Sequence, residues 1–180
     1  MSRSTGPDEA GFRRLHARTS TRLYGYVRRY CLEADCDDVI AEVYLVAWRR
    51  WDELPAEPMP WLLGTARRTI ANHWRSRDRR ERLAAELRGV QQLAAPDPAN
   101  QAIERTDLLR ALAELNPDDR EILLLVGWDG LTSAEAGAVL GVSAMAARAR
   151  LSRARHRLTD LVNEPSPTAE LHSTLLPEGH

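Results

Sequence analysis

The stretch "LTSAEAGAVLGVSAMAARARLSRARHRL", Leu131 to Leu158, has the pattern of two helices joined by a tight turn. Thr132 and Glu135 have the spacing of a capping box, in which each residue satisfies a free N–H group at the helix start. Gly141 can adopt the backbone conformation that ends this helix, and Ser143 can cap the next one. The stretch therefore predicts a helix-turn-helix unit.

The second helix of this unit has one packing face and one basic face. Ala147, Leu151, Ala154 and Leu158 recur at helical spacing and are predicted to pack on the partner helix. Small residues, Met145 and His156 lie opposite them, flanked by arginines at 148, 150, 153, 155 and 157. The N3 position holds Ala146 in place of an acid, so the helix start does not repel phosphate.

A face of small and apolar side chains between guanidinium groups suits the major groove of DNA, where thymine methyls and guanine acceptors are exposed. A basic face that contacts only solvent is the alternative. We predict DNA contacts from this set: Ser143, Met145, Ala146, Arg148, Ala149, Arg150, Ser152 and Arg153.

Composition indicates a globular chain. It has 180 residues, of which 43% are hydrophobic. Its apolar runs are shorter than the roughly 20 residues of a membrane span, and the polar N-terminus has no signal-peptide pattern. We therefore expect a cytoplasmic protein without a membrane partner. Cys31 and Cys36 match no zinc-site spacing, so reduced, partly buried thiols and no metal are expected.

Charge is segregated along the chain although the net charge is only −1. Acids dominate residues 33–57, whereas arginines dominate residues 61–82 and 148–157. Such a distribution indicates separate partners of opposite charge.

Helical periodicity recurs and strand signals are nearly absent, which predicts an all-α fold of two small helical domains joined by a linker, the second a helix-turn-helix. The predicted segments are a first domain over 8–82, a linker over 83–104, a second domain over 105–162 and a disordered tail over 163–180. In the first domain we expect helices at about Asp8–Tyr30 and Cys36–Trp51, with Asp35 as N-cap and Trp48 facing inward. Pro60 is expected in the first turn of a third helix.

The third helix carries a second basic face, opposite a predicted core stripe of Leu62, Ala66, Ile70 and Trp74. A row of guanidinium and amide groups can contact phosphates and bases. Trp61, at the helix start, is the tryptophan most expected to be exposed, and it could stack on unpaired bases. A core position is the alternative for each tryptophan. The predicted DNA contacts of this domain are Trp61, Arg68, Asn72, Arg75 and Arg79.

The second helix carries an acidic patch. Asp38 and Glu42 are one turn apart, with Asp35 one turn earlier. Each such like-charge pair costs about 0.2–0.5 kcal/mol, so the helix could be presenting the patch to a basic partner. A solvated acidic face is the alternative.

Four segments together resemble one family. They are "CDDVIAEVYLVAWRRWDEL", "PWLLGTARRTIANHWRSRDRR", "LAELNPDDREILLLVGWDGLT" and "LGVSAMAARARLSRARHRL". In this order the chain from Phe12 to Val162 resembles bacterial sigma factors of the extracytoplasmic-function (ECF) group. The resemblance implies a promoter-recognition subunit that binds core RNA polymerase and both double-stranded and melted promoter DNA. An anti-sigma factor could be a further partner.

The resemblance also implies roles for residues. Asp38 and Glu42 would dock on the clamp helices of the largest polymerase subunit, extended by Asp35. The loop 52–59 and the helix with Arg68, Asn72 and Arg75 would read and open the minus-ten element and hold a flipped base. Ser143, Arg148, Arg150 and Arg153 would enter the major groove at the minus-thirty-five element. The chain departs from the family pattern at Ala41, Arg68 and Ala146-Ala147. These departures affect which promoter sequence is expected more than they affect the expected role as a sigma factor.

Two other functional classes are alternatives. A dimeric helix-turn-helix regulator that acts without core polymerase needs only the second domain and leaves the acidic patch unexplained. An enzyme is not indicated, because His16, His73 and His156 lie on different helices and no triad or phosphate-loop motif occurs. We therefore expect no catalytic activity, no cofactor and no small-molecule substrate.

Overall fold

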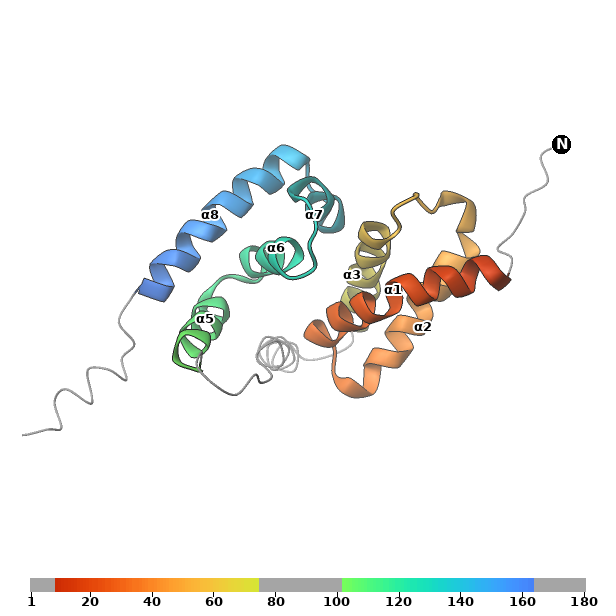
Figure 1. Cartoon of the computed structure of the whole chain (residues 1–180), viewed down its shortest axis with the longest axis horizontal. Helices are drawn as coiled ribbons and strands as arrows, with labels where there is room; N and C mark the ends of the chain where they lie inside the picture. Colours follow the sequence, from red (N-terminus) through yellow and green to blue (C-terminus); the bar gives the residue numbers. More distant parts are fainter. Residues whose placement is uncertain (1–8, 75–101, 164–180) are drawn as a thin grey trace, which may run out of the picture.

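The computed structural model describes residues 9–74 and 102–163, and within these ranges it contains helices and no strand (Figure 1). The first group of elements is α1 (Glu9–Tyr30), α2 (Glu33–Arg49), the short 3-10 helix η1 (Trp51–Glu53) and α3 (Met59–Trp74). The second group is α5 (Ala102–Glu114), α6 (Pro117–Gly127), α7 (Ser133–Leu140) and α8 (Ala144–Asn163). The all-α prediction is confirmed, and no described helix is both long and apolar enough to cross a bilayer.

The first domain is a bundle of α1, α2 and α3 around fully buried aliphatic side chains. Leu23 and Val27 of α1, Val43 of α2 and Leu62 of α3 have no exposed surface. The predicted core stripe of α3 is confirmed for Leu62, Ala66 and Ile70, which are buried; Trp74 is half-buried and donates its indole N–H to the Tyr30 carbonyl at 2.8 Å.

Three local predictions for α2 are wrong. Asp35 is not the N-cap: α2 begins one turn earlier, at Glu33 after Leu32, and this start places Cys36 in the core with its thiol donating to the Leu32 carbonyl. The helix ends at Arg49, before Trp51. Trp48 is 41% exposed, since Tyr44 and Ala47 occupy the inward positions and the indole instead meets Phe12 edge to face.

Both Cys31 and Cys36 are buried free thiols. Burial raises the pKa of the Cys36 thiol.

Capping groups define the helix ends of the second domain. The Asn116 side chain accepts from the Asp119 amide at 2.9 Å, directly before Pro117. Thr132 and Glu135 form the reciprocal capping box, and Gly141 ends α7 with φ of +72°. Arg120 is buried and donates to the carbonyls of three residues at the end of α5: Leu112, Ala113 and Leu115.

The two domains pack against each other, which the sequence does not predict. Figure 1 shows α7 next to α3, and one hydrophobic cluster contains side chains from both domains. α5 begins at Ala102, inside the predicted linker 83–104. The rest of that linker and the predicted tail beyond Asn163 lie outside the described residues.

Candidate nucleic-acid interface

Helix α8 packs through its predicted apolar stripe. Ala147, Leu151 and Ala154 are buried and Leu158 is half-buried, so this prediction is confirmed. Gly137 of α7 allows the close approach, because a Cβ there would lie 3.0 Å from the Ala147 Cβ and 3.1 Å from the Val142 carbonyl oxygen. The turn between the helices is thus tight enough to fix the direction in which α8 presents its other face.

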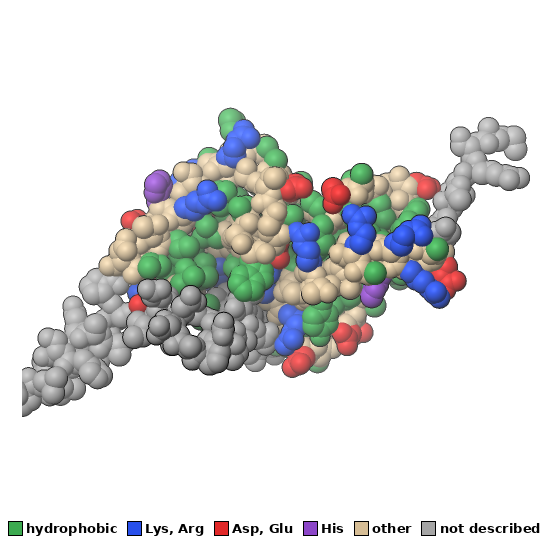
Figure 2. Space-filling model, viewed as in Figure 1, with side chains coloured by type: hydrophobic (Ala, Val, Ile, Leu, Met, Phe, Trp, Pro, Cys, Tyr) green, Lys and Arg blue, Asp and Glu red, His purple; other side chains and the backbone are tan. Residues whose placement is uncertain are grey.

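That other face of α8 is open to solvent. Met145 is 73% exposed, and its neighbours on this face are also exposed: Ser143, Ala146, Arg148, Ala149, Ser152 and Arg153. In Figure 2, basic side chains are spread along α8 between smaller ones. The Ser143 hydroxyl accepts from the Ala146 amide at 3.2 Å, so the expected cap is present.

Two arginines of α8 are held by acids of α6. Arg150 is half-buried and lies 3.2 Å from Asp118, and Arg157 is ion-paired with the buried Asp119. Their charges are therefore partly neutralised within the domain, unlike those of the exposed Arg148 and Arg153, for which no ion pair is found within the described residues.

The basic face of α3 is described only in part. Arg68 and Asn72 are exposed, one turn apart, and Arg68 donates to the Thr65 hydroxyl at 3.1 Å. Arg75 and Arg79 lie outside the described residues. Trp61 is half-buried against the hydrophobic cluster, whereas the most exposed indole of the described residues belongs to Trp128, after α6.

A cavity of about 290 Å³ lies between the start of α1 and the loop that follows η1. The half-buried Trp51 and the arginines Arg14 and Arg18 line it, together with prolines of the loop. Sequence reasoning did not single out Arg14 or Arg18. The sequence feature that could have indicated this cavity is the run of prolines after Trp51, because prolines stiffen the loop that lines it.

The acidic patch of α2 lies on the surface. Asp38 and Glu42 are exposed and Asp35 is half-buried. Glu42 also lies 3.4 Å from His73 of α3. Leu45 and Trp48 of the same helix are exposed apolar side chains that sequence reasoning did not assign to this surface. The patch is therefore partly apolar.

Comparison with known proteins gives a consistent result for both domains. Residues 15–80 match the family model described as "Sigma-70 region 2", and residues 105–158 match "Sigma-70, region 4". The chain is 31% identical over 172 residues to the RNA polymerase sigma factor CnrH of Cupriavidus metallidurans, covering 88% of this chain and 90% of that protein. It is 35% identical over 167 residues to the ECF RNA polymerase sigma factor SigF of Caulobacter vibrioides, covering 89% and 90%.

Solved structures show the same fold. The structure of CnrH in complex with the cytosolic domain of CnrY matches with a TM-score of 0.62 and 26% identity, over 88% of this chain and 92% of that one. The sigma factor RpoE in complex with the anti-sigma factor NepR from Bartonella quintana matches with a TM-score of 0.60 over 85% and 97%, at 22% identity.

Proposed function

The chain belongs to the ECF sigma factors of bacterial RNA polymerase, and we propose from this membership how its surfaces divide the work of promoter recognition. As a sigma factor it is a promoter-recognition subunit that binds core RNA polymerase and promoter DNA. The alternative of a dimeric regulator fails, because such a regulator has no use for a first domain that matches region 2. We further propose that it acts in the cytoplasm, where the polymerase works, and has no catalytic activity of its own.

The proposed domain boundaries are 8–82 and 105–162, with the linker between them. The family matches over 15–80 and 105–158 fall inside these ranges and support them. Each domain is assigned to one promoter element.

The second domain is assigned to the minus-thirty-five element, with α8 in the major groove. The supporting observation is the exposed face around Met145, edged by Arg148 and Arg153. We assign base contacts to the two edge arginines, to Ala149 and to Ser152. Phosphate contacts are assigned to the start of the helix, at Ser143 and Ala146. Arg150, which is ion-paired with Asp118, is also assigned a contact to a DNA phosphate.

The first domain is assigned to the minus-ten element. Arg68 and Asn72 form the described part of the contact face, which Arg75 and Arg79 would extend. Trp61 lies at the start of the same helix. The cavity beside Trp51 combines an aromatic wall with Arg14 and Arg18, which is the chemistry that holds an unstacked base, so we assign the flipped base to it.

Polymerase docking is assigned to Asp35, Asp38 and Glu42. Exposed carboxylates bordered by Leu45 and Trp48 offer a basic partner both charge and apolar contact. An anti-sigma factor is a further proposed partner, because the similar solved structure of the sigma factor RpoE is a complex with the anti-sigma factor NepR, and that of CnrH is a complex with the cytosolic domain of CnrY.

Run-off transcription with core polymerase and a promoter library tests the function as a whole. We expect specific transcripts that share two upstream elements. Transcription without any sequence preference, or tight operator binding by a homodimer in place of transcription, would contradict the proposal.

Charge reversal tests the docking assignment. Asp38→Arg should abolish binding to core polymerase while the helical content stays unchanged. Glu114→Arg reverses the charge of another exposed acid, at the end of α5, and serves as the matched control. Polymerase binding that survives Asp38→Arg, or that falls equally in both variants, would refute the assignment.

A further inference from the structure

Two neighbouring acids at the start of α6 each pair with an arginine of α8, and only one of the two acids is buried. Asp119 is 7% exposed, accepts a hydrogen bond from the Asn116 side-chain amide at 2.8 Å and pairs with Arg157. Asp118 is 58% exposed, and its carboxylate lies 3.2 Å from Nη1 of Arg150. The Asp119 pair is therefore part of the cap that begins α6, whereas the Asp118 pair lies at the surface.

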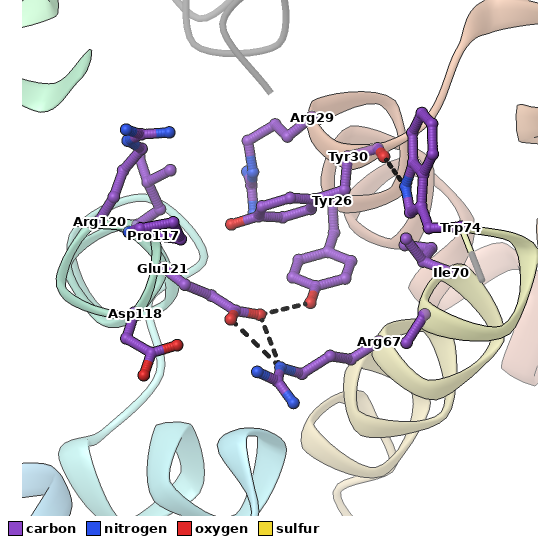
Figure 3. Close-up of a pocket in the computed structure, with 12 residues that line it drawn as sticks. Tyr26, Arg29, Tyr30, Arg67, Ile70, Trp74, Pro117, Asp118, Arg120 and Glu121 are labelled. Atoms are coloured by element: carbon purple, nitrogen blue, oxygen red, sulfur yellow. Dashed lines mark hydrogen bonds and ion pairs between the residues drawn. The ribbon is translucent and has the colours of Figure 1, made fainter. Parts of the chain in front are cut away.

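Within the described residues, Arg150 is the one ion-pair partner of Asp118, and its side chain is 28% exposed. In Figure 3, Tyr26 and Arg67 donate hydrogen bonds to Glu121, and Asp118 lies beside this group without a bond to it. Arg67 is thus engaged by Glu121, although the charge of Asp118 also acts on it. The contact that Asp118 makes is directed at the DNA-binding helix.

This pair distinguishes Arg150 from the other arginines of the proposed DNA face. Arg148 and Arg153 are exposed and have no ion pair within the residues that the structure describes. A guanidinium that is already paired with a carboxylate brings little net charge to DNA, and a phosphate that approaches it also approaches the negative charge of Asp118. Fewer counterions are then released from the DNA, so Arg150 adds less to affinity than an unpaired arginine would.

The pair with Arg150 contributes little to the stability of the fold. An exposed ion pair gains little, because water screens it and two long side chains lose freedom. Asp118 also lies in the first turn of α6, where the helix dipole favours a negative charge. That effect is a structural alternative for the presence of the acid, but it predicts no link between Asp118 and DNA. Salt dependence and coupling to Arg150 therefore separate the two roles.

We propose that Asp118 is a positioning residue that holds Arg150 back from DNA and so limits the sequence-independent part of DNA affinity. The proposal rests on the assignment of α8 to the minus-thirty-five element. A phosphate contact carries no sequence information, so the restraint acts equally on promoter and on unrelated DNA. Without it the sigma factor would be held more tightly on every duplex, while its preference among bases would stay the same.

Asp118→Asn removes the charge at nearly constant shape. The full chain in complex with core polymerase is titrated, over a series of salt concentrations, with a duplex that carries only the upstream element and with an unrelated duplex of equal length. We expect the slope of log K against log salt to steepen by about 0.9, which is one further phosphate neutralised. The Kd at about 0.15 M salt should fall about fivefold on both duplexes, which is the factor that this slope gives between about 1 M and 0.15 M.

Two control variants separate the pair from a general change of charge. Glu114→Gln removes another exposed acid of the same domain, whose partner at 3.1 Å is Arg110, outside the proposed DNA face, and it should leave the slope unchanged. Asp118→Glu keeps the charge and should behave like the wild type. Unchanged far-UV circular dichroism shows that each variant is folded.

A double-mutant cycle with Arg150→Gln decides the mechanism. In the Arg150→Gln background, Asp118→Asn should no longer change the slope or the Kd, because the arginine that it releases is absent. A gain of the same size in both backgrounds would overturn the proposal, and so would an unchanged or shallower slope in Asp118→Asn alone. If the wild-type complex did not distinguish the upstream element from the unrelated duplex, the proposed function would fail, whereas the cycle on either duplex would still decide whether Asp118 restrains Arg150.

Discussion

Gly137 lies where α7 and α8 approach each other closely, so Gly137→Ala is a direct test of the helix-turn-helix geometry. The added methyl would lie 3.0 Å from the Ala147 Cβ, 3.1 Å from the Val142 carbonyl oxygen and 3.4 Å from that of Ser143. Two of these neighbours are backbone atoms of the turn. The Val142 amide donates to the Gly137 carbonyl at 2.9 Å, so the turn has little freedom to move away.

The expected cost follows from two opposing effects. Alanine favours the helix by about 0.8–1 kcal/mol relative to glycine. Overpacking in a site that is already filled costs about 1–3 kcal/mol. Gly25→Ala in α1 isolates the first effect, because nothing lies within 4 Å of the position of its Cβ. Gly25→Ala should therefore be stabilising, and Gly137→Ala should be about 1–3 kcal/mol less stable than Gly25→Ala.

Urea denaturation of the full chain, followed by circular dichroism, measures this difference. Binding to a selected promoter should also weaken in Gly137→Ala, because the extra methyl changes the angle at which α8 leaves the turn. Equal stabilisation by the two substitutions would show that the helices are not in the close contact described, and the geometry of the DNA-binding face would have to be revised.

Three further substitutions test the caps and the contact face. Thr132→Ala should destabilise the chain by about 1 kcal/mol at neutral pH. Hydrogen bonds from the hydroxyl and amide of Thr132 lower the pKa of Glu135, so this stabilisation is present above the unfolded pKa and is lost as the pH falls through the folded one; denaturation below about pH 4 should show a smaller difference. Gly141→Ala should cost about 1–2 kcal/mol in a melting experiment although space is free around it, because an L-residue is strained at φ of +72°. Arg148→Ala should lower affinity for a selected promoter by about 1–3 kcal/mol and relax preference at one base pair. Arg13→Ala, which removes an exposed arginine paired to Glu9, should leave DNA binding unchanged.

The sequence predicts the second domain well because its signals are local. A capping box, a glycine with positive φ and an apolar stripe each depend on residues a few positions apart, and all three occur in the structure. The errors in α2 have the opposite origin. Whether Asp35 caps the helix or Trp48 faces inward depends on how α1 packs on α2, and no pattern within α2 contains that information.

The buried ion pair between Arg29 and Asp129 could not be predicted for a related reason. Arg29 and Asp129 are 100 positions apart, and each has the surroundings of an ordinary surface charge in the sequence. Burial of a charge is decided by a distant partner, so a charged residue in a helix gives no local sign that it will be buried.

The same effect limits what a run of arginines indicates. Arg67 precedes Arg68 in the chain, yet Arg67 is bound to Glu121 across the domain interface while Arg68 is exposed. In α8, Arg150 and Arg157 are similarly paired with acids of α6, whereas Arg148 and Arg153 are exposed. Counting every arginine as a phosphate contact would therefore overestimate the salt dependence of DNA binding, because an arginine already paired with a carboxylate releases fewer counterions from DNA. The arginines that decide promoter affinity are those that the fold leaves exposed.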